Sequence, residues 1–166
     1  LIAKNYQIPT FQRDVVWDQE NVKKLWDSIY KFYPLGSILI WKTGTKLQNH
    51  RQIGGHQIVD TNFNRTEYQY ILDGQQRTTS LLTSLYGGII ESKPNFNPTL
   101  YVDLTILSDN DLDDENYKSR FLFWNEIDDR NGEIKANIRK KKRYNDGLIV
   151  KLIDIKNDFA KIQTAI

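Results

Sequence analysis

The sequence contains neither cysteine nor methionine. The lack of cysteine excludes a disulfide framework, a thiolate zinc site and a cysteine nucleophile. No apolar stretch approaches the roughly 18 residues of a membrane span, and the start lacks the charged-then-apolar pattern of a secretory signal. We therefore expect a soluble, cytoplasmic domain with no membrane partner. Because the chain opens at Leu1 without an initiator methionine, we also expect it to be a piece of a longer protein.

An excess of one charge sign is missing as well. The 23 Lys and Arg residues face 21 Asp and Glu residues, for a net charge of +2, so bulk charge does not identify nucleic acid as a partner. With 166 residues, 39% of them hydrophobic, the chain is long enough to enclose one sizeable core. We expect a single domain over residues 1–166.

Apolar residues at helical spacing predict two amphipathic helices. The first covers residues 22–33, with Asp18 as its N-cap and Pro34 as its stop. The second covers residues 78–86 and ends at Gly87, a residue type favoured at helix C-termini.

Short apolar or alternating runs predict strands, the first of them buried, at residues 37–41, 67–72, 100–104 and 121–124. A polar excursion fills residues 46–64, and a closing helix is expected within residues 148–166. Strands and helices mix without strict alternation, which indicates an α+β (mixed α/β) domain with a small mixed sheet and flanking helices.

The most informative segment follows the second predicted strand and opens the second helix. At that junction, unpaired N–H groups and the helix dipole favour a phosphate. Glycine permits close approach, arginine offers a two-pronged cationic contact, and the Gln and Thr side chains add neutral hydrogen bonds. The residues are Asp73, Gly74, Gln75, Gln76, Arg77 and Thr78.

Asp73 carries negative charge and would repel a bare phosphate. Beside Arg77, it suggests a role in holding Mg²⁺, in orienting water or in fixing the arginine, and we favour metal or water. The alternative is that Asp73-Gly74 is only a turn and Arg77 only a surface residue. Burying such a polar run without partners is costly, which favours a site.

A second segment, residues 8–17, contains Gln12 and Arg13 between apolar anchors. We expect Phe11 and Trp17 to pack inward. Arg13 is either a second phosphate-facing cation or the partner of a carboxylate such as Asp14.

These segments together resemble the N-terminal domain of GmrSD-like type IV restriction enzymes. The matching residues are Ile8-Pro9-Thr10-Phe11-Gln12-Arg13, Trp17, Pro34-Leu35-Gly36 and Leu72-Asp73-Gly74-Gln75-Gln76-Arg77-Thr78. The resemblance is specific over roughly the first 90 residues and vague afterwards. It implies a ParB/sulfiredoxin-like fold that binds and hydrolyses a nucleoside triphosphate, and thereby controls cleavage of modified foreign DNA. The cutting is expected from a C-terminal His-Asn-His nuclease domain or subunit.

Three functions compete on this basis. The leading one is a metal-assisted nucleotidase in which Arg13 and Arg77 clamp phosphates, while the motif's glutamines orient them and Asp73 positions Mg²⁺ or water. In this scheme the catalytic residues are Asp73, Gln75, Gln76 and Arg77, and Gln12, Arg13, Gly74 and Thr78 bind the nucleotide. The runner-up is a switch module that binds a nucleotide or a modified base without turnover. Direct DNA cleavage is weaker, because only one carboxylate is well placed.

The remaining charged and metal-ligating residues are weaker candidates. A sulfiredoxin-type reduction is excluded by the lack of cysteine. His50 and His56 lie in the polar excursion, where a surface role is favoured over a metal-ligand role. The acidic segment 109–115 is expected to be a solvated connection. The basic run 139–143 is favoured as a solvated loop over a DNA contact.

Overall fold

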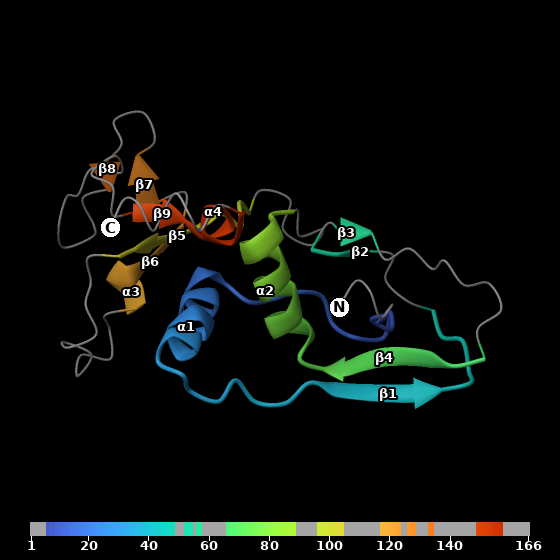
Figure 1. Cartoon of the computed structure of the whole chain (residues 1–166). Helices are drawn as coiled ribbons and strands as arrows, with labels where there is room; N and C mark the ends of the chain where they lie inside the picture. Colours follow the sequence, from blue (N-terminus) through green and yellow to red (C-terminus); the bar gives the residue numbers. More distant parts are fainter. Residues whose placement is uncertain are drawn as a thin grey trace.

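The structure is a computed structural model that describes residues 6–48, 52–54, 56–57, 66–88, 96–104, 117–123, 126–128, 133–134 and 149–157. Helices and small sheets alternate irregularly along these residues (Figure 1), which confirms the α+β class. The helices are α1 (Gln19–Tyr30), α2 (Gln75–Tyr86), α3 (Tyr117–Arg120) and α4 (Leu152–Asn157). The strands are β1 (Leu39–Thr43), β2 (Gln52–Ile53), β3 (His56–Gln57), β4 (Tyr68–Asp73), β5 (Leu100–Asp103), β6 (Phe121–Phe123), β7 (Ile127–Asp128), β8 (Glu133–Ile134) and β9 (Ile149–Lys151).

The described strands form several small antiparallel sheets and not the one small mixed sheet that was predicted. β1 pairs with β4, β2 with β3 and β7 with β8, while β5 lies between β6 and β9. Parallel pairing among the described residues is limited to an isolated bridge between Gln7 and Tyr70. The sheets are separated because α1 and α2 stand between the β1–β4 ribbon and the β6–β5–β9 sheet (Figure 1).

Helix α1 begins as predicted and ends earlier than predicted. The Asp18 carboxylate accepts a hydrogen bond from the Asn21 amide at 2.9 Å, which caps the first turn. The helix ends at Tyr30 because the chain turns at Phe32, whose φ of 57° lies in the left-handed region. Phe32 and Tyr33, which the apolar spacing assigned to the helix, lie beyond it and are exposed. That part of the prediction was wrong.

The main core lies between α1 and the β6–β5–β9 sheet. Its buried side chains are Val22, Trp26, Leu100, Val102, Tyr117, Phe121, Phe123 and Leu152. A smaller cluster of Ile8, Ile53 and Ile71 packs under β4. The N-terminal lead-in therefore rests on β4, because Gln7 exchanges backbone hydrogen bonds with Gln69 and Ile71 on either side of Tyr70.

Two predictions about strands need correction. The run 37–41 was expected to be a buried strand, yet β1 starts at Leu39 and is mostly exposed, since β4 is its one neighbour among the described strands. Within residues 148–166, where a closing helix was expected, β9 first pairs with β5 over Ile149–Lys151, and the helix, α4, begins at Leu152. Residues 158–166, the acidic segment 109–115, the basic run 139–143, Trp124 and His50 lie outside the described residues.

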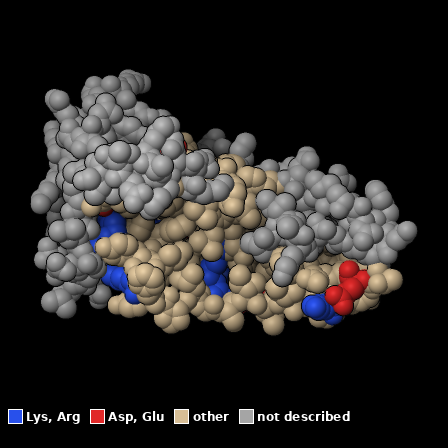
Figure 2. Space-filling view, in the orientation of Figure 1, with Lys and Arg blue, Asp and Glu red and all other residues tan. Residues whose placement is uncertain are grey.

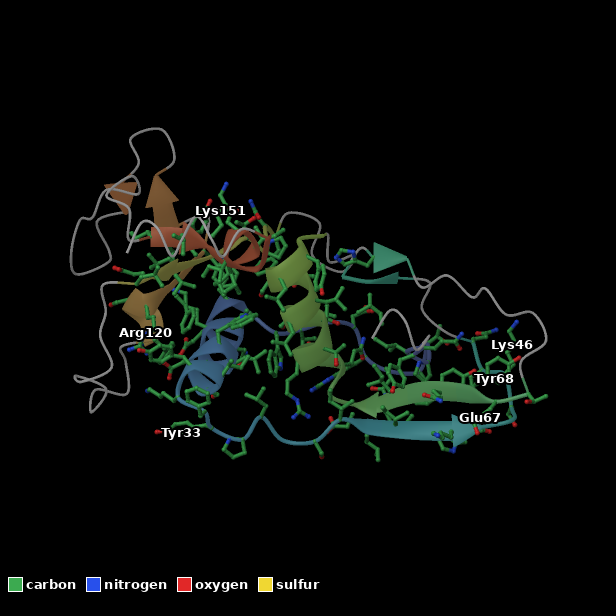
Figure 3. The ribbon with its side chains drawn as sticks, viewed as in Figure 1. Tyr33, Lys46, Glu67, Tyr68, Arg120 and Lys151 are labelled. Carbon is green, nitrogen blue, oxygen red and sulfur yellow. The ribbon has the colours of Figure 1, made fainter. Side chains whose placement is uncertain are left out.

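A cluster of charged side chains joins α1 to α3. Asp27 accepts a hydrogen bond from Arg120 Nη1 at 3.0 Å and pairs with Lys31 Nζ at 2.9 Å. The Arg120 guanidinium also lies 4.0 Å from the centre of the Tyr30 ring, and Figure 3 shows Arg120 on the α3 side of α1. Arg120 is only 1% exposed, so the interior here is held by charge as well as by apolar packing.

A second polar contact between the same helices is at the surface. Glu20 accepts hydrogen bonds from Lys24 and from the Tyr117 hydroxyl at 2.8 Å. The hydrogen bond from Lys24 and, to a smaller extent, the one from Tyr117 lower the pKa of Glu20 below its usual value. Burial, followed by the bond to Glu20, raises the pKa of Tyr117.

Among the described residues, no helix combines the length and the apolar character needed to cross a bilayer.

Candidate functional site

The predicted site lies where β4 passes into α2. β4 ends at Asp73, Gly74 adopts a left-handed φ of 92°, and α2 begins at Gln75. A Cβ atom on Gly74 would lie 3.1 Å from Ile38 Cγ1, so both conformation and space favour glycine here. The Asp-Gly turn at this junction is confirmed.

The first turn of α2 has no side-chain cap. The Gly74 carbonyl accepts a hydrogen bond from the Thr78 amide at 2.8 Å. Glycine has no side chain that could accept hydrogen bonds from the N–H groups of Gln75, Gln76 and Arg77. These N–H groups have no acceptor further back in the helix, and they lie at the positive end of its dipole. We call these three N–H groups together with Gly74 the α2 start, and this is the kind of geometry that accepts a phosphate or another anion.

The side chain of Gln76 holds the N-terminal lead-in against the α2 start. Its Oε1 accepts hydrogen bonds from the Val16 amide at 2.9 Å and the Trp17 amide at 3.2 Å. Its Nε2 donates to the Asp14 carbonyl at 3.0 Å. Because both ends of the amide are used by the backbone of residues 14–17, these contacts favour a positioning role over the phosphate-orienting role expected from sequence.

Gln12 and Arg13 lie just before that contact. Gln12 Nε2 donates to the Leu72 carbonyl at 2.9 Å, so the chain is tied to β4 on one side of Arg13 and to Gln76 on the other. Arg13 itself is exposed and makes no hydrogen bond or ion pair with the described residues. The alternative in which Arg13 pairs with Asp14 is therefore not seen within this part of the chain. The backbone of Arg13 therefore lies between two anchored positions near the α2 start.

Arg77 points away from the lead-in and holds the Pro34-Leu35-Gly36 turn. Its Nη1 donates to the Leu35 carbonyl, and its Nη2 donates to the Ser37 carbonyl at 2.8 Å. A Cβ atom on Gly36 would lie 2.5 Å from Arg77 Nη1, and φ there is 78°. The glycine of this turn is thus explained by the close approach of the arginine.

Asp73 contacts Arg77 and remains largely in solvent. Its Oδ2 lies 3.2 Å from Arg77 Nη2, and its side chain is 68% exposed. Fixing the arginine is the role that sequence analysis favoured less. Oδ1 has no described partner, and one carboxylate oxygen is a sufficient protein ligand for Mg²⁺ when phosphates and water fill the other positions. The residues fit a metal held by Asp73 together with a nucleotide. The described residues contain no group of three His, Cys, Asp or Glu side chains that would hold a metal on their own.

Gln75 and Thr78 are the buried polar members of the motif. Gln75 is 8% exposed and Thr78 is 1% exposed. Among the described residues, the Thr78 hydroxyl has no hydrogen-bond partner, an uncommon state for a buried polar atom.

Comparison with known families identifies the chain. The family described as the GmrSD restriction endonuclease N-terminal domain matches residues 1–165. The chain belongs to this family. Membership implies a role in a restriction system.

Relatives of the GmrSD domain add little about activity. An uncharacterized protein of Methanocaldococcus jannaschii is 28% identical over 121 residues, covering 68% of this chain and 21% of that protein. The chain thus spans about a fifth of the length of the curated relative it matches. No solved structure matches the chain, so the ParB/sulfiredoxin-like fold stays a prediction.

Several features of this GmrSD domain escaped sequence analysis. α2 buries a face rich in hydroxyl groups, made by Thr78, Thr79, Ser80, Thr83 and Ser84, whereas the predicted stripe consisted of Thr78, Leu81, Leu82, Leu85 and Tyr86. Helical spacing of these short polar residues was the available signal.

Two aromatic residues of the lead-in and one histidine differ in how far they are buried. His56 is half-buried, and its Nε2 lies 2.7 Å from the Gly87 carbonyl, which gives it a contact to the end of α2. Phe11 was expected to pack inward and is 67% exposed, so that prediction was wrong. Trp17 is half-buried.

Proposed function

We propose that this domain binds and hydrolyses a nucleoside triphosphate at the α2 start, and that the nucleotide controls cleavage of modified foreign DNA by a nuclease part of the full-length protein. The observation that carries the proposal is the pairing of an uncapped helix start with the unengaged Arg13. Hydrogen bonds from Gln12 to the Leu72 carbonyl and from Gln76 to the Asp14 carbonyl hold the backbone on both sides of Arg13 near this helix start. The resemblance to GmrSD-like enzymes supplies the class of ligand and the expectation of a His-Asn-His nuclease partner.

Each motif residue then has a distinct role. The N–H groups of the α2 start and the Arg13 guanidinium bind phosphate oxygens. Thr78 and Gln75 supply buried polar groups beside them, and Gly74 allows the ligand to approach the backbone. Gln76 and Arg77 position the surrounding chain.

In the proposed hydrolysis, the positive groups of the site stabilise the negative charge on the phosphoryl group. Water attacks the terminal phosphorus, the bond to the bridging oxygen breaks, and a nucleoside diphosphate and phosphate are released. The α2 start and Arg13 stabilise the negative charge on the transferred phosphoryl oxygens. Asp73 would hold Mg²⁺ or orient the water, and Mg²⁺ bound there would supply further charge neutralisation.

Arg13→Ala is expected to weaken nucleotide binding by about 1.5–3 kcal/mol, the contribution of a hydrogen bond to a charged group. Unfolding should be unchanged, because Arg13 is exposed and makes no hydrogen bond or ion pair within the described residues. Isothermal titration with a non-hydrolysable nucleoside triphosphate in Mg²⁺ measures the effect. Lys46→Ala removes another exposed cation, at the far end of the β1–β4 ribbon (Figure 3), and should bind like the unmodified chain. Equal affinity in all three proteins would remove Arg13 from the site.

Asp73→Asn is expected to lower the rate of phosphate release about tenfold or more while leaving nucleotide affinity close to normal. Asparagine keeps the turn and can still accept a hydrogen bond from Arg77, but it loses the negative charge that attracts Mg²⁺. Phosphate release measured across a magnesium titration tests this. Normal turnover by the variant would refute the role of Asp73.

The second candidate is a nucleotide-binding or modified-base-binding switch without turnover. It is favoured by the contact of Asp73 with Arg77, because that contact already gives the carboxylate a structural task. Multiple-turnover phosphate release by the unmodified chain distinguishes the two. Nucleotide binding without release at any magnesium concentration would favour the switch.

A further inference from the structure

A continuous stretch of the chain exposes large apolar side chains where α1 leads into β1. We call residues 30–41 the apolar belt. Six of the nine exposed large hydrophobic residues of the described chain lie in it: Tyr30 39%, Phe32 95%, Tyr33 61%, Ile38 45%, Leu39 56% and Trp41 41% exposed. The belt follows the lower edge of the molecule (Figure 1), which is mostly uncharged in the space-filling view (Figure 2). Tyr33 points outward from this edge (Figure 3).

Phe32 is exposed although its backbone conformation is unfavourable. Its φ of 57° is the one positive value among the described residues other than glycine. A bulky residue in the left-handed region is disfavoured, and an aromatic ring that is 95% exposed returns no packing energy within the chain. A surface that covered the ring would explain why phenylalanine and not glycine occupies this turn.

The belt continues into an open strand edge. β1 pairs with β4, and its other edge has no strand partner among the described residues. An exposed edge with apolar side chains such as Leu39 and Trp41 favours pairing with another strand.

The belt also lacks the charge that would oppose association with itself. Residues 30–41 contain one charged side chain, Lys31, and Asp27 pairs with it at 2.9 Å. The next residue of β1, Lys42, lies 3.9 Å from the Glu67 carboxylate. Both positive charges near the belt therefore have a nearby carboxylate, which reduces repulsion between two copies. Taking about 200 Å² for a fully exposed large side chain, the six residues expose roughly 700 Å², close to the roughly 800 Å² that each partner buries in a standard interface.

We propose that the apolar belt is a homodimer interface, in which β1 pairs antiparallel with β1 of a second copy across a two-fold axis. An antiparallel pair of identical strands is related by such an axis, so the same patch faces itself. The Phe32 and Leu39 side chains then lie in the buried part of the interface.

Sedimentation equilibrium of the 166-residue chain tests the proposal. The unmodified chain should show a monomer–dimer equilibrium. Leu39→Lys, which places a charge at the start of β1 within the belt, and Phe32→Gly should each raise the dimer dissociation constant about tenfold or more, equivalent to roughly 1.4 kcal/mol. Tyr86→Ser changes a residue that is 49% exposed at the end of α2, and it should leave the constant within about twofold.

The Phe32→Gly variant also separates loss of the dimer from loss of the fold. Glycine adopts a positive φ without strain, so the monomeric variant should unfold at a temperature no lower than the unmodified monomer. A chain that stays monomeric up to its solubility limit would overturn the proposal and leave the belt to another part of the endonuclease. A dimer that both belt variants leave intact would also overturn it.

Discussion

Replacing Asp27 by alanine is expected to destabilise the domain by about 3–5 kcal/mol, the cost of removing one partner from a buried ion pair. Arg120 is 1% exposed and the Asp27 side chain 11% exposed, with 3.0 Å between Arg120 Nη1 and Asp27 Oδ1. The alanine variant leaves the guanidinium buried without this carboxylate. It also removes the partner of Lys31. The stacking of Arg120 on Tyr30 remains and offsets only part of the loss.

Urea unfolding measures this effect against a matched control. Asp14 is an exposed acid whose side chain makes no described contact, so Asp14→Ala should change stability by less than about 0.5 kcal/mol. Asp27→Asn keeps the shape and removes the charge, and should fall between the two. A loss below about 1 kcal/mol for Asp27→Ala would mean that water reaches Arg120.

Replacing Arg77 by alanine is expected to cost about 2–4 kcal/mol of stability, because hydrogen bonds from a charged group contribute about 1.5–3 kcal/mol each and are not additive. The guanidinium bonds the carbonyls of Leu35 and Ser37 as well as Asp73. Its side chain is 19% exposed, so water replaces these bonds only in part. The sequence alone suggested that Arg77 acts on phosphate.

Arg77→Lys separates positioning from phosphate binding. Lysine keeps the charge but cannot hold two carbonyls with a planar fork, so it should recover only part of the stability lost in the alanine variant. If Arg77 positions the chain, the folded lysine variant should bind nucleotide with close to normal affinity. A loss of affinity near tenfold with unchanged stability would instead make Arg77 a direct phosphate ligand.

Sequence patterns predicted those helices and strands that depend on neighbouring residues in the chain. The start of α1 at Asp18, the span of α2 and the strands β4 and β5 follow from a capping residue, helical spacing and alternation. The exposure of β1 could not be predicted in this way, because burial of a strand depends on neighbours that lie elsewhere in the chain. Phe32 and Tyr33 continued the helical spacing, and only the backbone turn at Phe32 removes them from α1.

The candidate site shows the same division. Its place at the start of a helix follows from the order of strand, Asp-Gly turn and polar run. The role of Gln76 does not, because its partners are about 60 residues away in the sequence. A glutamine that binds backbone and a glutamine that binds phosphate look identical until the fold brings the lead-in beside it. The same holds for Arg77 and the turn at Gly36.

The guanidinium of Arg77 has a limited number of donors, and that limit connects two surfaces of the domain. Of its five N–H groups, the described contacts use one on Nη1 and both on Nη2. A phosphate that took a two-pronged contact from Nη1 and Nη2 would use the remaining N–H of Nη1 and would displace Ser37 or Asp73 from Nη2. Ser37 belongs to the apolar belt, so its displacement would alter the shape of the belt. A partner that binds one shape of the belt more tightly would then change the affinity for nucleotide. By thermodynamic reciprocity, nucleotide would change the affinity for that partner by the same factor.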